Sequence, residues 1–279
     1  MTPISSPAPP RIGLEIAPES GVELLNAGQP LAGIDYLALR HRPSSRHSLE
    51  DLLIFHSLLT SQLGMPILLH LPLQRIHGLS NPERKAYFQH LASTSPSALL
   101  AIHGDDHSGG EVPLPAMCRF LSELRSMLPA SRILVAGHPR TLHDSSSRMR
   151  EQETLQKKVQ CGVDGILTQM LSSPTEYTSY TAFTAAAIGS IPVIPGIPLA
   201  PTLEIAEKFQ LELSGIGLHD TTGWTAALAT DLAHLHPDAL HFFGTGTAMH
   251  DIDLLQTAVL PRIRDGNRDI VQSLNADDT

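Results

Sequence analysis

The sequence has little charge for its size and few cysteines, and both facts narrow the classes of protein it can encode. Only 17% of the 279 residues are charged, whereas 42% are hydrophobic, which predicts one large domain with a sizeable core. The net charge of −9 and the isoelectric point near 5.9 argue against nucleic acid or an anionic membrane as the main partner. The two cysteines, Cys118 and Cys161, lie in apolar helical patterns, which favours free thiols in a reducing cytoplasm.

Long apolar runs and targeting signals are also missing. No apolar run approaches the length of a membrane-spanning helix, and the opening MTPISSPAPP has neither the basic region nor the apolar segment of a secretion signal. We therefore expect a cytoplasmic protein with a flexible leader over residues 1–10, a single domain over 11–265 and a polar C-terminal tail over 266–279.

What the sequence does contain is a repeated unit of a short apolar strand followed by a helical pattern. Strands that are apolar throughout are typical of a parallel sheet covered on both faces. The expected strands are residues 11–16, 34–39, 67–71, 98–102, 133–136, 163–167, 191–194 and 239–243. Eight such units predict an α/β fold, a single-domain (β/α)₈ or TIM barrel. An open doubly wound sheet is the alternative, but no G-x-G-x-x-G motif follows the first strand to support it.

Polar residues end several of the expected strands, where barrels of this kind carry their chemistry. Thr168 and Gln169 follow the sixth strand, which is otherwise apolar, so a ligand-binding role is predicted for them. Glu15 stands near the end of the first strand, where an apolar environment suits a proton-donating carboxyl. Glu15 could equally be a strand-end carboxylate paired with Arg11 or Arg40, and both interpretations stay open.

Seven short motifs, in order over nearly the whole chain, resemble those of the methylenetetrahydrofolate reductase family. No single motif is specific, but their joint spacing is. They are GLEIAP at residues 13–18, HL at 70–71, LAIHGD at 100–105, VAGHP at 135–139, CGVDGILTQ at 161–169, IPGI at 194–197 and HFF at 241–243. Members of this family are flavin-dependent barrels that reduce methylenetetrahydrofolate to methyltetrahydrofolate, so the resemblance implies an oxidoreductase of one-carbon metabolism.

The resemblance implies a role for each matched position on the folate side. Glu15 would be the general acid that protonates the folate nitrogen. Asp105 would lie near the flavin ring and the folate pterin, tuning the flavin and orienting the pterin. Gln169 would hydrogen-bond the pterin amide edge, because its side-chain amide can both donate and accept hydrogen bonds. Thr168 would bind the substrate beside it. Phe209 would pack on the aminobenzoyl ring, although its helical spacing is equally that of a core residue.

The resemblance also implies FAD as cofactor, NADH or NADPH as hydride donor, a reduced folate as small-molecule partner, and no metal. It is compatible with a homo-oligomer. The matched cofactor positions are His70, His103, Gly104, Asp105, His138, Lys157 and Lys158. The two lysines end a helical pattern, where cations complement the helix dipole even without a phosphate, so they are weak evidence for a cofactor.

Several family positions are substituted, which supports a second hypothesis. After the second strand, the family's threonine-tyrosine-glycine-alanine is here Arg40-His41-Arg42-Pro43, which puts bulky cations where a flavin needs a small hydroxyl. Residues 244–247 replace the segment that carries the family's substrate-binding arginine. The chain could therefore be a catalytically silent or FAD-independent relative that binds a folate.

A hypothesis from another class is a metal-dependent barrel hydrolase. The sequence has fifteen histidines, and His70, His103 and His138 come from the ends of three consecutive expected strands. Imidazoles in such positions can assemble a catalytic zinc site. Against this hypothesis, no H-x-H pair follows the first strand.

Overall fold

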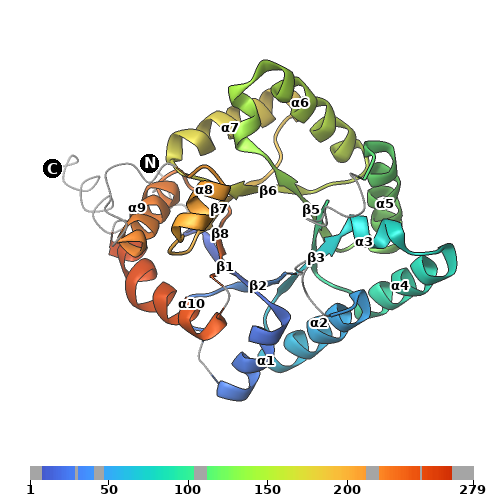
Figure 1. Cartoon of the computed structure of the whole chain (residues 1–279), viewed down its shortest axis with the longest axis horizontal. Coiled ribbons are helices and arrows are strands. Elements are labelled where there is room, and N and C mark those ends of the chain that lie inside the picture. Colours follow the sequence, from blue (N-terminus) through green and yellow to red (C-terminus); the bar gives the residue numbers. More distant parts are fainter. Residues whose placement is uncertain are drawn as a thin grey trace, which may run out of the picture.

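The computed structural model describes residues 8–28, 31–40, 47–103, 112–211, 220–245 and 247–265. Its centre is a closed barrel of eight parallel strands, paired in sequence order (Figure 1). The strands are β1 (Arg11–Ile16), β2 (Tyr36–Leu39), β3 (Ile67–Pro72), β4 (Ala98–Ile102), β5 (Arg132–Gly137), β6 (Gly165–Met170), β7 (Val193–Pro198) and β8 (Ala239–Phe243). The predicted single-domain (β/α)₈ barrel is confirmed.

Helices form an outer ring around this barrel (Figure 1). They are α1 (Pro18–Ala27), α2 (Leu49–Leu63), α3 (Leu73–Gly78), α4 (Asn81–Thr94), α5 (Leu114–Met127), the 3-10 helix η1 (Pro139–His143), α6 (Ser145–Gln160), α7 (Pro174–Ile188), α8 (Leu203–Lys208), α9 (Thr221–Ala233), α10 (Ala248–Leu254) and the π-helical turn η2 (Leu255–Val259). The sequence places Ser48, a residue type that favours the N-cap, three positions before Asp51. In the structure they cap α2, because each accepts a backbone hydrogen bond from the other. Within the described ranges, none of the helices is both long and apolar enough to cross a membrane.

Two apolar cores explain why the strands have no polar face. The larger core fills the space between the strands and the surrounding helices. The smaller core lies inside the barrel and consists of Ala38, Leu68, Leu100, Leu134, Leu167, Ile194 and Ala239. Each strand is therefore buried on both faces, as a parallel barrel requires. Because side chains fill the barrel interior, the chemistry must lie at the ends of the strands.

A tyrosine ring occupies the barrel interior next to β1, and this explains a glycine in the first strand. A Cβ atom on Gly13 would lie 2.0 Å from Cζ of Tyr36, so only glycine leaves room for the ring. The Tyr36 hydroxyl lies 3.2 Å from Nδ1 of His241 on β8. Burial raises the pKa of Tyr36, which keeps the hydroxyl neutral.

The sixth and seventh strands run further than the sequence predicts. The apolar runs end at residues 167 and 194, but β6 continues to Met170 and β7 to Pro198. The pairing shifts between Leu167 and Met170, opposite Pro195, which has no N–H to give to the sheet. The Thr168 hydroxyl instead accepts a hydrogen bond of 2.9 Å from the N–H of Gly196. The predicted C-terminal ends of β6 and β7 are wrong, because the Thr168 side chain continues the hydrogen bonding between the two strands beyond the apolar runs.

The helical pattern of the sequence over about residues 202–213 predicts one helix there, and the helix found in the structure is shorter. Helix α8 covers Leu203–Lys208, and residues 212–219 lie outside the described ranges. Helix α3, which follows β3 directly, has no counterpart among the predicted elements.

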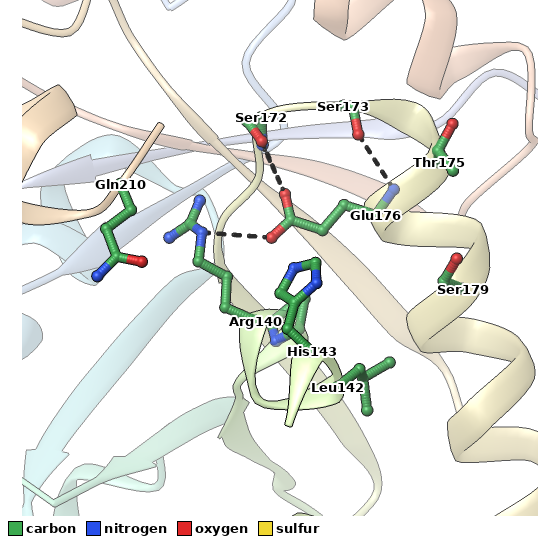
Figure 2. A pocket seen from close by; sticks show the side chains of 10 residues that line it. Arg140, Leu142, His143, Ser172, Ser173, Thr175, Glu176, Ser179 and Gln210 are labelled. Atoms are coloured by element: carbon green, nitrogen blue, oxygen red, sulfur yellow. Dashed lines mark hydrogen bonds and ion pairs between the residues drawn. The ribbon is translucent and has the colours of Figure 1, made fainter. Parts of the chain in front are cut away.

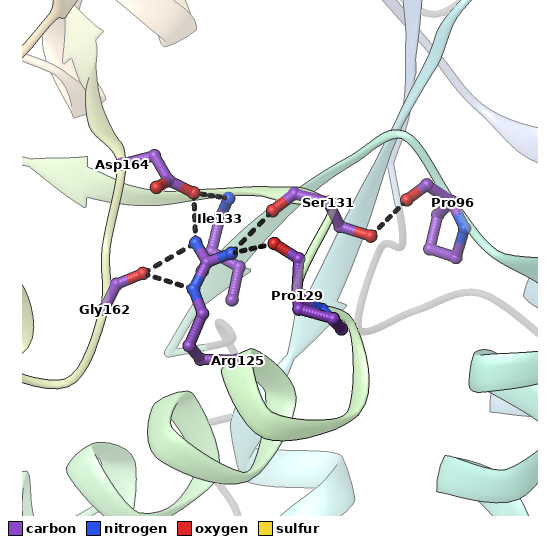
Figure 3. Close-up of polar contacts among 7 residues, drawn as sticks. All are labelled: Pro96, Arg125, Pro129, Ser131, Ile133, Gly162 and Asp164. Carbon is purple, nitrogen blue, oxygen red and sulfur yellow. Dashed lines mark hydrogen bonds and ion pairs between the residues drawn. The ribbon is translucent and has the colours of Figure 1, made fainter.

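One arginine links the loops at the strand starts, the end of the barrel opposite the strand tips (Figure 3). Arg125 on α5 donates hydrogen bonds to the carbonyls of Gly162, Pro129 and Ser131 and pairs with the carboxylate of Asp164. Asp164 in turn accepts the N–H of Ile133, at 2.7 Å. This network fixes the entry into β5 and β6.

Candidate functional site

Glu15 lies at the mouth of the barrel, and its carboxylate is paired with an arginine. The side chain of Glu15 is only 3% exposed, and its Oε1 lies 2.6 Å from Nη1 of Arg40. Glu15 pairs with Ala38 where β1 and β2 are adjacent, and Arg40 comes two residues later, just after the end of β2. Of the two partners considered from the sequence, Arg40 is the one found, whereas Arg11 is exposed at the start of β1. His41, Arg42 and Pro43, the other substituted residues of this loop, lie outside the described ranges.

Two buried histidines, His70 and His241, lie near Glu15 and Arg40, and we call these four residues the polar floor of the mouth. Nε2 of His70, on β3, lies 3.8 Å from Oε2 of Glu15, which is beyond hydrogen-bonding distance. Burial, together with the nearby His241 and Arg40, lowers the pKa of His70 well below its usual value. Burial alone lowers the pKa of His241 to about 3. Both rings are therefore neutral near pH 7, so each carries one donor and one acceptor nitrogen.

Three buried nitrogens around this mouth have no hydrogen-bond partner among the residues that the structure describes. They are Nε of Arg40, Nε2 of His70 and Nε2 of His241. Buried polar atoms in native proteins are nearly always paired with protein or ordered water, so three such atoms in one place require a partner. A polar ligand that both donates and accepts hydrogen bonds would satisfy them.

The predicted folate-binding residues lie at other points of the same rim. Gln169 is exposed near the end of β6, and two strands, β7 and β8, separate β6 from β1. Thr168 is buried, and its hydroxyl is used to hold Gly196. Phe209 is half-buried just after α8, with Nζ of Lys208 5.5 Å from its ring centre. The structure thus brings Glu15 and Gln169 to one end of the barrel without a direct contact between them.

The structure places some of the predicted cofactor residues at the ends of the strands, and others lie outside the described ranges. His103 and His138 are half-buried just past the ends of β4 and β5. Of these two strands, β4 lies beside β3, which carries His70, and β5 is the next one around the barrel. The backbone N–H of His138 donates to Oε1 of Glu151 at 3.1 Å. Gly104 and Asp105 lie outside the described ranges.

The two lysines are not part of this rim. Lys157 and Lys158 lie in the last turn of α6, which runs back toward the start of β6. The exposed Lys157 pairs with Glu153 one turn earlier. Lys158 is buried near Glu151, and burial lowers its pKa. The structure therefore pairs Lys157 and buries Lys158 within the helix layer, and it does not bring them to the strand tips.

A polar cavity of about 540 Å³ beside the rim was not predicted from the sequence (Figure 2). Its walls come from η1, the loop after β6, the first turns of α7 and the end of α8. Arg140 donates to the carbonyl of Met170 at 2.8 Å, and its Nε lies 3.4 Å from Oε1 of Glu176. Oε2 of the same carboxylate accepts the N–H of Ser172. A signal in the sequence is Arg140 itself, which stands where the family that the motifs resemble has a glutamate, but its partner Glu176 is distant in sequence.

The metal-site hypothesis finds no support in the described part of the chain. No three or more histidine, cysteine, aspartate or glutamate side chains there form a group that could hold a metal ion. His70, His103 and His138 come from neighbouring strands, but they do not converge as ligands. Asp105, a carboxylate two residues after His103 that could join such a site, lies outside the described ranges.

Comparison with known proteins points to one family. The family model for methylenetetrahydrofolate reductase matches residues 61–217, which is more than half of the chain. These residues include β3 to β7 and therefore His70, His103, His138 and Gln169. No curated protein sequence matches the chain.

Solved structures share the barrel at low sequence identity. An uncharacterized protein from Clostridium thermocellum that binds two copies of 5-methyl-5,6,7,8-tetrahydrofolic acid aligns with a TM-score of 0.60 and 12% identity, covering 91% of this chain and 96% of that one. A putative lyase/mutase from Burkholderia cenocepacia J2315 aligns at 0.54 and 14%, covering 94% and 91%. A thermostable xylanase mutant from Cellvibrio japonicus aligns at 0.56 and 11%, covering 85% and 87%. At such identities these similarities establish the fold alone.

Proposed function

Because the chain belongs to the methylenetetrahydrofolate reductase family, we propose that it binds a reduced folate at the strand-tip rim of the barrel and interconverts 5,10-methylenetetrahydrofolate and 5-methyltetrahydrofolate. The observation that carries the proposal is the polar floor of the mouth. A buried carboxylate and three nitrogens that no described residue satisfies match a heterocycle with donors and acceptors along its edge. The Clostridium protein, which has the same fold, binds a reduced folate, and this supports the same ligand class here.

In this proposal Glu15 exchanges a proton with the folate. Opening of the methylene bridge requires a proton on the leaving nitrogen, and Glu15 is the carboxyl that the family resemblance assigns to this step. Gln169 hydrogen-bonds the pterin amide edge, and Phe209 packs on the aminobenzoyl ring. Thr168 acts indirectly, because its hydroxyl fixes Gly196 beside the end of β6. Asp105 keeps the role near the flavin ring and the pterin that the resemblance implies.

The residues at the mouth are compatible with a flavin. His70 offers a buried Nε2 that has no hydrogen-bond partner among the described residues, and His103 and His138 follow the next two strands. These three residues, with Gly104 and Asp105, would hold FAD, which carries the hydride between NADH or NADPH and the folate. The FAD diphosphate would need partners other than Lys157 and Lys158, because both lie in the last turn of α6, away from the strand tips.

An absorption spectrum of the purified protein, before and after addition of FAD, tests this function most simply. We expect a flavin spectrum that NADH or NADPH bleaches and that 5,10-methylenetetrahydrofolate restores. A protein that takes up FAD but does not pass electrons to the folate would contradict the proposed reaction.

A second candidate is a folate-binding protein that does not use FAD. The ion pair between Arg40 and Glu15 favours it, because the guanidinium occupies the mouth and the carboxylate is already paired. This candidate predicts calorimetric binding of 5-methyltetrahydrofolate by protein that remains colourless after incubation with FAD. If the colourless protein does not bind 5-methyltetrahydrofolate, this second candidate is excluded.

A further inference from the structure

The polar cavity beside the rim contains an arginine whose guanidinium is only partly used by the protein (Figure 2). Nη2 of Arg140 donates to the carbonyl of Met170 at 2.8 Å, and Nε lies 3.4 Å from Oε1 of Glu176. Among the described residues, Nη1 has no hydrogen-bond partner. Both terminal nitrogens of a guanidinium carry N–H donors in one plane, so this edge of Arg140 is available to a ligand with two acceptor oxygens.

The acidic residue of the cavity is turned toward its own loop and leaves this edge open. Oε2 of Glu176 accepts the N–H of Ser172 at 2.8 Å and the Ser172 hydroxyl at 3.1 Å, while Oε1 faces Nε of Arg140. The Glu176 side chain is only 10% exposed. In Figure 2 the guanidinium lies between Glu176 and Gln210, with its terminal nitrogens on the side of Gln210. Glu176 thus holds Arg140 with its terminal nitrogens toward the cavity.

The rest of the cavity wall suits an anionic group. Glu176 is the one carboxylate among the described residues that line the cavity, and the others include a histidine, an amide and four hydroxyls, those of Ser172, Ser173, Thr175 and Ser179. The wall also includes the first turn of α7, where the helix dipole places partial positive charge. The volume of about 540 Å³ is within the range of about 300–1,000 Å³ that is usual for small-molecule sites. These features fit a carboxylate of a small ligand.

The cavity adjoins two residues to which the proposed function assigns folate contacts. Gln169, proposed for the pterin, directly precedes Met170, whose carbonyl binds Arg140. Phe209, proposed for the aminobenzoyl ring, directly precedes Gln210 in the cavity wall. In a reduced folate the glutamyl group, which bears the carboxylates, follows the aminobenzoyl ring. The part of the ligand beyond Phe209 is therefore its anionic end.

We propose that the cavity at Arg140 binds the glutamyl carboxylates of the reduced folate and that Arg140 is the residue that recognises them. A carboxylate can accept a hydrogen bond from each terminal nitrogen of the guanidinium, which is the bidentate geometry that arginine favours. Because the family has a glutamate where this chain has Arg140, the site would distinguish this chain from other members. The inference rests on the proposed folate function.

Calorimetric titration with two forms of one ligand tests the inference. The dimethyl ester of 5-methyltetrahydrofolate keeps the rings and the size of the glutamyl group but removes its negative charges. We expect the wild type to bind the acid about 10–100-fold more tightly than the ester, which is the range of charge-assisted hydrogen bonds. Arg140→Met should lose most of this preference and bind the ester as the wild type does. Arg140→Lys should lie between them, because an ammonium keeps the charge but not the planar fork.

Full retention of the preference in Arg140→Met would overturn the inference. A second variant keeps the test decisive if Arg140→Met does not fold. Gln210 is exposed in the cavity wall, and Gln210→Glu should weaken binding of the acid by about fivefold through like-charge repulsion, with little effect on the ester. Gln62→Glu is the matched control, because Gln62 is exposed on α2, across the barrel from α7 (Figure 1). Equal effects of these two substitutions would contradict the inference.

The inference and the proposed function fail in different ways. If the wild type binds the acid and the ester equally tightly, a reduced folate binds but the cavity does not recognise its carboxylates, so the inference fails and the folate site stands. If the wild type binds neither form, the proposed function fails, and the inference fails with it.

Discussion

At the scale of single residues, the barrel mouth combines one charged pair with neutral groups. From the sequence, Glu15 could be a catalytic acid or a carboxylate in an ion pair. The structure shows the ion pair, with Arg40 as the partner of Glu15. The pairing could be considered from the sequence because Arg40 follows a strand adjacent to β1. The neutral state of His70 and His241 could not be predicted, since it depends on complete burial inside the closed barrel.

Replacement of Glu15 by glutamine should separate the two halves of the proposed reaction. We expect Glu15→Gln to lower folate turnover by at least about 100-fold, because a general acid contributes that much or more. Reduction of bound flavin by NADH or NADPH should stay nearly unchanged, because that step does not involve the folate. Stopped-flow measurement of each half-reaction checks this. Glu19→Gln is the control, because Glu19 is exposed on α1. An equal loss in both halves would contradict the acid role.

The buried histidines should make the protein less stable in mild acid. Since the folded pKa of His241 is about 3 and the ordinary value is 6.5, the unfolded chain binds a proton first as the pH falls. The histidine contribution is thus fully present above about pH 6.5 and is lost progressively toward pH 3. Between pH 6.5 and pH 5, His241 alone should cost about 2 kcal/mol of unfolding free energy.

Urea unfolding at several pH values measures this effect. His241→Asn should have a shallower loss of unfolding free energy between pH 6.5 and pH 5 than the wild type. His250→Asn is the matched control, because His250 is exposed on α10 and should leave the slope unchanged. Parallel pH profiles for the wild type and His241→Asn would contradict a buried, neutral His241.

At the scale of elements, local patterns locate regular strands and helices but miss pairing that side chains support. The predicted bounds of β4 and β8 are those observed, because short apolar runs define them. The ends of β6 and β7 are wrong because the Thr168 hydroxyl, which is distant in sequence from Gly196, continues the sheet across Pro195. Such a contact exists only once the two strands are adjacent.

The arginine network at the strand starts is the element-scale feature most open to testing. We expect Arg125→Met to lower the unfolding free energy by about 2–4 kcal/mol, because several carbonyls and the carboxylate of Asp164 lose their charged donor. Chemical denaturation measures the difference. Arg119→Met, an exposed change on the same helix, should alter stability by less than about 0.5 kcal/mol. Equal effects of the two substitutions would contradict a structural role for the network.

At the scale of the whole molecule, the barrel could be predicted because its eight units repeat one pattern along an uninterrupted chain. The fold alone says little about chemistry, since a xylanase and a lyase/mutase share it. The functional assignment depends instead on the family match and on the residues at the strand tips. The polar cavity at Arg140 could not be predicted, because its walls come from four separate segments.

The central claim is that a reduced folate binds at the strand tips, with its pterin between Glu15 on β1 and Gln169 on β6. A crystal structure of the protein with 5-methyltetrahydrofolate tests it most directly. The account predicts pterin density in the barrel mouth, within hydrogen-bonding distance of both the Glu15 carboxyl and the Gln169 amide. A pterin bound elsewhere, with Glu15 and Gln169 facing separate regions, would contradict it.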